Sequence, residues 1–71
     1  MDLVTAEMGA IVWKLTVADG DEVAAGDVIA ILESMKMEIP VDAPSGGRVH
    51  YLVDAGAEVA EGGVIAEITQ P

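Results

Sequence analysis

Apolar and polar side chains alternate at period two along residues 13–17 and 49–53, which is the pattern of a half-buried β-strand. The bulky positions are Trp13, Leu15 and Val17 in the first stretch and Val49, Tyr51 and Val53 in the second. Runs rich in β-branched residues, 28–32 and 64–68, follow turns that contain glycine. We therefore expect an all-β chain, and the strands are predicted near residues 2–7, 10–17, 21–23, 28–34, 37–43, 46–53, 57–59 and 64–70.

An internal repeat divides the chain into two halves. Residues 20–32 align with residues 56–68 without a gap, and both copies read Gly-x-Glu-Val-Ala-x-Gly-x-Val-Ile-Ala-x-[Leu/Ile]. Two copies of one β pattern predict two structurally equivalent halves related by a pseudo-twofold axis. The spacing of the strands and turns is typical of a sandwich or a flattened barrel.

The boundary between the halves carries the most distinctive motif, residues 33–38, which read Glu-Ser-Met-Lys-Met-Glu. Only Met35 and Lys36 separate the two strands expected here, so they are predicted to form the tip of a tight hairpin. An exposed primary amine can be acylated to a stable amide, but lysine reacts only when it is deprotonated. Few lysine side chains are deprotonated near neutral pH. A partner enzyme must therefore bind the hairpin and assist proton loss. We interpret Lys36 as a site of covalent modification.

Composition limits the other functions that the chain can have. Its 71 residues form one small domain with no room for an active-site cleft. The 13 acidic and 3 basic residues give a formal net charge of −10, which disfavours nucleic acid and anionic membranes and favours basic surfaces of other proteins. There is no cysteine, and hence neither a disulfide nor a thiolate metal site.

No catalytic or metal-binding residue is predicted. Residues 19–30 superficially resemble a calcium loop, but Val23 and Ala30 stand where oxygen ligands are needed. His50 has no second imidazole to act with and is interpreted as a surface residue, while Trp13 is interpreted as a packing residue. The start of the chain lacks the features of a signal peptide and no apolar run reaches transmembrane length, so we expect a cytoplasmic protein.

Residues 33–40 resemble the [Ala/Ser]-Met-Lys-Met attachment motif of biotinyl domains. The likeness extends to the paired glycine-containing turns and to residues 43–46, which read Ala-Pro-x-Gly, and is closest to the short biotin carboxyl carrier and biotin/lipoyl attachment proteins. The resemblance implies one biotinyl domain over residues 1–71. Its fold would be a flattened barrel of two four-stranded antiparallel sheets, with the target lysine on one hairpin and both termini at the far end.

The resemblance also implies a function. A biotin protein ligase would transfer biotin from its adenylate to Lys36, a biotin carboxylase would carboxylate the biotin, and a carboxyltransferase would pass the carboxyl group to an acceptor, commonly an acyl-CoA in fatty acid metabolism. The domain would be monomeric and catalyse nothing itself. Met35 and Met37 would flank the site as recognition residues, and the candidate ligase contacts are Glu33, Ser34 and Glu38.

Three alternatives stay open. Lipoyl domains share the implied fold but usually present Asp-Lys-[Ala/Val] at the tip, so methionine on both sides of Lys36 favours biotin, with lipoate as the alternative cofactor. Met35 and Met37 could instead be apolar side chains that cap the barrel. A plain β interaction module without any cofactor would require the motif to be a coincidence.

Overall fold

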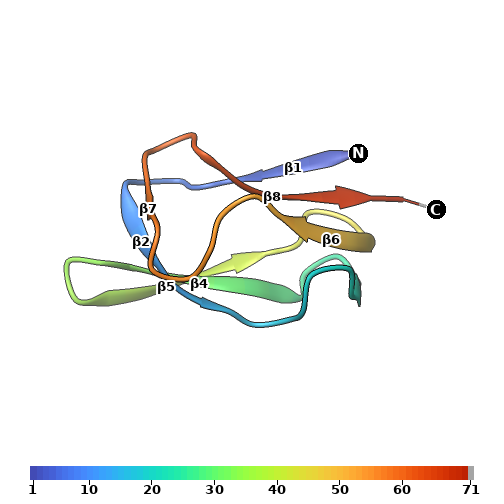
Figure 1. The fold of residues 1–71 in the computed structure, drawn as a ribbon, viewed down its shortest axis with the longest axis horizontal. Helices are drawn as coiled ribbons and strands as arrows, with labels where there is room; N and C mark the ends of the chain where they lie inside the picture. The colour runs from blue at the N-terminus through green and yellow to red at the C-terminus, as the bar shows by residue number, and fades with distance from the viewer. Residues whose placement is uncertain (71) are drawn as a thin grey trace.

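The computed structural model describes residues 1–70, which form two four-stranded antiparallel sheets and no helix (Figure 1). The strands are β1 (Asp2–Thr5), β2 (Ala10–Leu15), β3 (Glu22–Val23), β4 (Val28–Ser34), β5 (Met37–Asp42), β6 (Gly47–Tyr51), β7 (Glu58–Val59) and β8 (Val64–Thr69). All eight expected strands are present, with ends within two residues of their predicted positions. The prediction of an all-β sandwich of two four-stranded sheets is confirmed.

The two sheets are built from equivalent strands, as the sequence repeat predicts. One sheet has the order β1-β8-β6-β3 and the other has the order β5-β4-β2-β7. The repeat aligns β8 with β4 and β3 with β7, and the shared strand order then matches β6 with β2 and β1 with β5. Each sheet therefore contains strands from both halves of the sequence, which explains why neither half can close its own core.

Two bulges at equivalent positions build the centre of the core. The β4–β5 pairing skips Ile29, and the β1–β8 pairing skips Ile65. A bulge turns two consecutive side chains toward one face, so each isoleucine and the alanine after it are both completely buried. Burying one isoleucine contributes about 2 kcal/mol. The rest of the buried apolar core is Val4, Ala6, Val12, Val23, Leu32, Ala43, Val49 and Ile68.

A third bulge, at Trp13, has no equivalent in the other half. The β2–β4 pairing passes from Val12–Leu32 to Lys14–Ile31 and skips Trp13, whereas the β6–β8 pairing is regular. The bulge reverses the expected alternation, because Val12 is buried while Trp13 remains 43% exposed. The interpretation of Trp13 as a packing residue is therefore wrong. Its indole ring lies under the ammonium group of Lys14, 4.5 Å from Nζ to the ring centroid.

The first and last strands close the barrel. Residues 2–5 of β1 pair with residues 64–68 of β8, and the extents of the molecule are 36 × 19 × 18 Å. Figure 1 shows the N and C termini together at one end and the β4–β5 hairpin at the opposite end. At the terminal end, the Gln70 side-chain amide donates to Ser45 Oγ at 3.0 Å and to the Gly46 carbonyl at 3.1 Å.

Candidate functional site

The β4–β5 hairpin ends in a two-residue turn with an unusual backbone. Ser34 pairs with Met37, and the two residues between them have left-handed conformations, with φ of 52° at Met35 and 67° at Lys36. Positive φ at both central positions is the geometry of a type I′ turn. This turn matches the twist of the flanking strands, and the β4–β5 hairpin that it closes lies at one end of the molecule (Figure 1).

A left-handed conformation costs an L-residue about 1 kcal/mol or more. The other tight turns with positive φ place glycine at that position, at Gly20, Gly26, Gly56 and Gly62. Folding alone would favour Asn-Gly in a type I′ turn. The tip therefore holds two side chains that the turn itself does not require, and backbone strain of this kind is concentrated at functional sites.

Both methionines are exposed. Met35 is 92% exposed and Met37 is 61% exposed, so neither caps the barrel or belongs to its core. Unbranched thioether side chains adapt to partner surfaces of different shapes. Their position on either side of Lys36 makes them available to any protein that approaches the amine.

The polar neighbours of the tip lie at the root of the hairpin. Glu33 and Glu38 face each other across β4 and β5, and both are exposed, whereas Ser34 is half-buried. Within residues 1–70 Arg48 forms an ion pair with Glu22 and the His50 ring lies near Asp19, and neither contact involves Lys36. The hairpin thus brings together all six residues that the sequence singled out and leaves the amine accessible.

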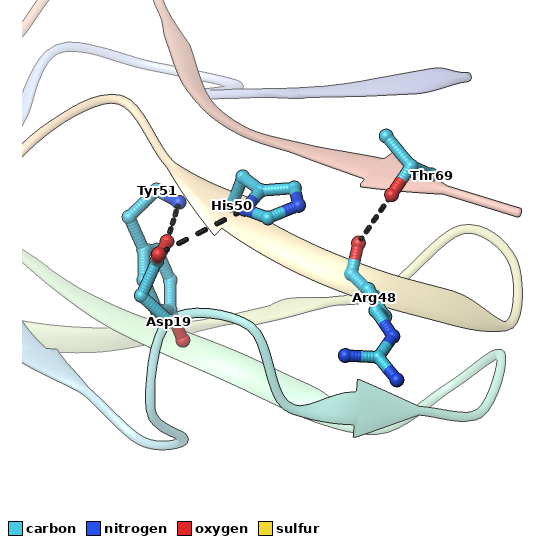
Figure 2. Close-up of polar contacts among 5 residues, drawn as sticks. All are labelled: Asp19, Arg48, His50, Tyr51 and Thr69. Carbon is cyan, nitrogen blue, oxygen red and sulfur yellow. Dashed lines mark hydrogen bonds and ion pairs between the residues drawn. The ribbon is translucent and has the colours of Figure 1, made fainter.

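His50 lies far from the hairpin and has a structural setting. Its Nδ1 is 3.8 Å from Asp19 Oδ2, while Asp19 Oδ1 accepts a hydrogen bond from the Tyr51 backbone N–H at 2.8 Å (Figure 2). These contacts tie the turn after β2 to β6. No group of three or more His, Cys, Asp or Glu side chains within residues 1–70 is arranged to hold a metal ion.

Tyr51 is the one group of the described chain with a clear change in acidity. Its hydroxyl donates to the Ile29 carbonyl at 2.7 Å. Partial burial raises the pKa of the Tyr51 phenol above its usual value, and the carboxylates of Asp19 and Asp21 act in the same direction. A hydrogen bond with the backbone of Val17 acts in the opposite sense. The phenol is therefore neutral and structural at physiological pH.

The sequence did not predict the groove that lies beside the hairpin. A groove of about 370 Å³ runs between the hairpin and β7, and Ile11 and Glu58 are among its lining residues. The signal that could have found it is the repeat, because the strand that holds Ile11 aligns with the strand that holds Arg48. Arg48 is basic and Ile11 is apolar, so this alignment indicates that the two equivalent surfaces differ in chemistry.

A small β-barrel that presents one lysine at an exposed hairpin has the architecture of a cofactor-attachment domain. The chain belongs to the biotin/lipoyl attachment family, because the family described as "Biotin-requiring enzyme" matches residues 2–68. The resemblance seen in the sequence is thereby confirmed, and biotin is the cofactor of this family. The part of the chain that the structure describes contains no helix that is long and apolar enough to span a membrane.

Individual relatives differ greatly in length. The chain is 47% identical over 68 residues to the biotin-dependent acyl-coenzyme A carboxylase alpha3 subunit of Mycobacterium leprae, covering 94% of this chain but 11% of that protein. It is 42% identical over 67 residues to the biotin/lipoyl attachment protein of Bacillus subtilis, covering 93% of this chain and 92% of the relative. The Kluyveromyces lactis urea carboxylase structure superposes with a TM-score of 0.89 at 38% identity, covering 96% of this chain and 6% of that one.

Proposed function

We propose that Lys36 carries biotin as an amide on Nζ and that the chain is a biotin carboxyl carrier. The observation that carries this proposal is the hairpin tip. A lysine between two exposed methionines occupies a turn whose backbone favours glycine, at the end of the molecule farthest from the termini. Membership of a biotin-requiring family supports biotin as the group attached.

Attachment needs a partner enzyme, a biotin protein ligase. The Lys36 amine attacks the carboxyl carbon of biotinyl-adenylate, an amide bond forms, AMP leaves, and the amine loses a proton. The domain contributes the nucleophile and its presentation, and it catalyses nothing itself. Met35 and Met37 serve as flanking contacts, and Glu33, Ser34 and Glu38 are the contacts proposed at the root of the hairpin.

The attached biotin then visits two active sites, those of a biotin carboxylase and a carboxyltransferase. Tethering replaces a dilute bimolecular encounter by an intramolecular one. The rigid barrel holds the lysine at its tip, and the lysyl arm supplies the motion. The name of the Mycobacterium leprae relative supports an acyl-CoA as the carboxyl acceptor. That residues 1–71 form a single monomeric domain, and that it is cytoplasmic, remain predictions.

The assignment is tested with the two lysines of the chain, Lys36 and Lys14. Lys36→Arg, Lys14→Arg and the wild-type protein are incubated with biotin protein ligase, biotin and ATP, and modification is read from intact mass and from binding to labelled avidin. Wild type and Lys14→Arg should gain one biotinyl group, and Lys36→Arg should gain none. Avidin binding by Lys36→Arg would show that the attachment site is wrong.

A lipoyl carrier is the second candidate, and the name of the Bacillus subtilis relative favours keeping it. Exchanging biotin and its ligase for lipoate and a lipoate ligase in the same assay separates the two. Modification by lipoate at a rate equal to that of biotin would make this a dual carrier. We expect biotin to be strongly preferred, because methionine flanks the lysine on both sides.

A further inference from the structure

Two grooves on the surface are related by the pseudo-twofold axis. The first, called here the hairpin groove, lies between β7 and the β4–β5 hairpin. It is lined by Gly9, Ala10, Ile11, Glu33, Ser34, Met35, Glu58 and Val59. The second, the terminal groove, lies between β3 and the end of β8. Its lining is Gly46, Gly47, Arg48, Thr69, Gln70, Glu22 and Val23.

Apart from Met35, the two linings correspond residue by residue. In the hairpin groove Ile11 of β2 stands directly opposite Glu33 of β4 on one side and Glu58 of β7 on the other. In the terminal groove Arg48 of β6 stands directly opposite Thr69 on one side and Glu22 on the other. Directly opposed side chains lie on the same face of a sheet. The central residue is thus an arginine in one groove and an isoleucine in the other.

The terminal groove supplies its own cation. Arg48 Nη2 lies 3.9 Å from Glu22 Oε1, and Figure 2 shows the Arg48 side chain extending from β6 toward β3. The carboxylate that borders this groove is therefore partly compensated from within the chain. Arg48 is thus itself one of the residues that line the terminal groove.

The hairpin groove has two carboxylates and no cation. Within residues 1–70 neither Glu33 nor Glu58 has a basic group within ion-pair distance. Lys14 lies over the Trp13 ring. Between the two carboxylates, Ile11 is 45% exposed and offers an apolar floor. Acidic walls over an apolar floor are complementary to a long basic side chain, whose stem packs on apolar surface while its head pairs with carboxylates.

From this geometry we infer that the hairpin groove receives an arginine or lysine side chain of the biotin protein ligase, with its stem on Ile11 and its charged head at Glu58 and Glu33. The inference rests on the function proposed above. The ligase is the occupant because it must reach the unmodified amine of Lys36. The lysine side chain is shorter than the biotinyl-lysine arm, so the surface of the ligase must come close to the flank of the hairpin. Enzymes that act on the longer biotinyl arm need not approach so closely.

The decisive experiment compares Glu58→Lys with Glu22→Lys. Both variants change the net charge from −10 by the same amount, at equivalent positions of opposite ends, so long-range attraction is matched. With a purified ligase that modifies the wild-type chain, we expect kcat/KM for biotinylation to fall about tenfold in Glu58→Lys and less than about twofold in Glu22→Lys. Equal losses in the two variants would overturn the inference.

A second variant, Ile11→Arg, gives the hairpin groove the internal arginine that the terminal groove already has. Because position 11 is exposed, the thermal midpoint should remain close to that of wild type. Biotinylation should slow about tenfold and become less sensitive to salt, since the groove is then occupied and neutralised. Unchanged kinetics in a folded Ile11→Arg protein would contradict the inference while leaving Lys36 as the attachment site. Failure of the wild type itself to be modified would instead overturn both proposals.

Discussion

The two ends of this molecule are symmetry mates that have been put to different uses. At one end β4 continues into β5 through Met35 and Lys36, and at the other the equivalent strands β8 and β1 end without such a connection. The strands, their order and two of the three bulges are shared, whereas the Trp13 bulge, the tip and the central residue of the groove beside it are not. The shared part is what folding requires, and two of the departures, the tip and the groove, are the places where we propose that partners act.

The largest expected effect concerns two equivalent strand positions, Gly47 in β6 and Ala10 in β2. A Cβ added to Gly47 would collide with the backbone oxygen of Thr69 and lie 2.9 Å from Ile68 Cγ2. We expect Gly47→Ala to destabilise the domain by about 3 kcal/mol, because overpacking against backbone cannot relax. Its mate Ala10→Gly should cost about 1 kcal/mol or less. Urea unfolding measures both, and similar losses would mean that β6 shifts to admit the methyl group.

The next effect has the opposite sign and concerns the hairpin tip. The double variant Met35→Asn, Lys36→Gly should stabilise the domain by about 2 kcal/mol, because the preferred type I′ pair relieves two left-handed L-residues. The control is Gly56→Ala, whose φ of +94° penalises any side chain, and which should be less stable than wild type. A double variant no more stable than wild type would show that Met35 and Lys36 carry no strain.

The smallest effect concerns Tyr51 of β6, whose mate in β2 is Leu15, a side chain that cannot ionise. Tyr51→Phe should lose about 1 kcal/mol near pH 8, since the hydrogen bond to the Ile29 carbonyl disappears. The pKa of Tyr51 is raised above its usual value of 10.0 in the folded protein. Its contribution to stability is therefore complete below about pH 10 and is lost as the pH rises through the folded-state pKa.

Unfolding free energies of the wild type and Tyr51→Phe, measured from pH 8 to 11, should therefore converge at the alkaline end. A difference that stays constant with pH would show that the phenol titrates alike in the folded and unfolded chains, and a difference that widens would show that folding lowers its pKa.

The strands and the hairpin could be predicted from the sequence because they depend on local signals. Period-two alternation and glycine-containing turns located all eight strands, and the two-residue gap between predicted strands placed Lys36 at the tip. The repeat also accounts for the pairing of β1 with β8, because the β4–β5 hairpin corresponds by symmetry to the first and last strands. These features depend on residues that are close together in sequence or related by a fixed offset.

The bulges could not be read in the same way. Whether Trp13 sits in the β2 ladder or is skipped depends on the partner residues Leu32 and Ile31, which lie in another strand. The same holds for Ile29 and Ile65, where two buried residues in succession break the alternation. The sequence does contain one sign of the third bulge. Val12 matches Val49 at an offset of 37, whereas later residues of the strand match at an offset of 36, so the first half has one extra residue after Val12. Only the register shows that this residue is Trp13.

The juxtaposition of the first and last strands has a consequence for how such a domain can be joined to a longer chain. Entry and exit of the chain lie about one strand spacing, roughly 5 Å, apart, at the end opposite the hairpin of a body 36 Å long. A host polypeptide can therefore accept the whole unit at a single surface point without disturbing the tip. Such closely spaced ends suit insertion into a longer chain, and the sequence matches 11% of one relative's length and 92% of another's.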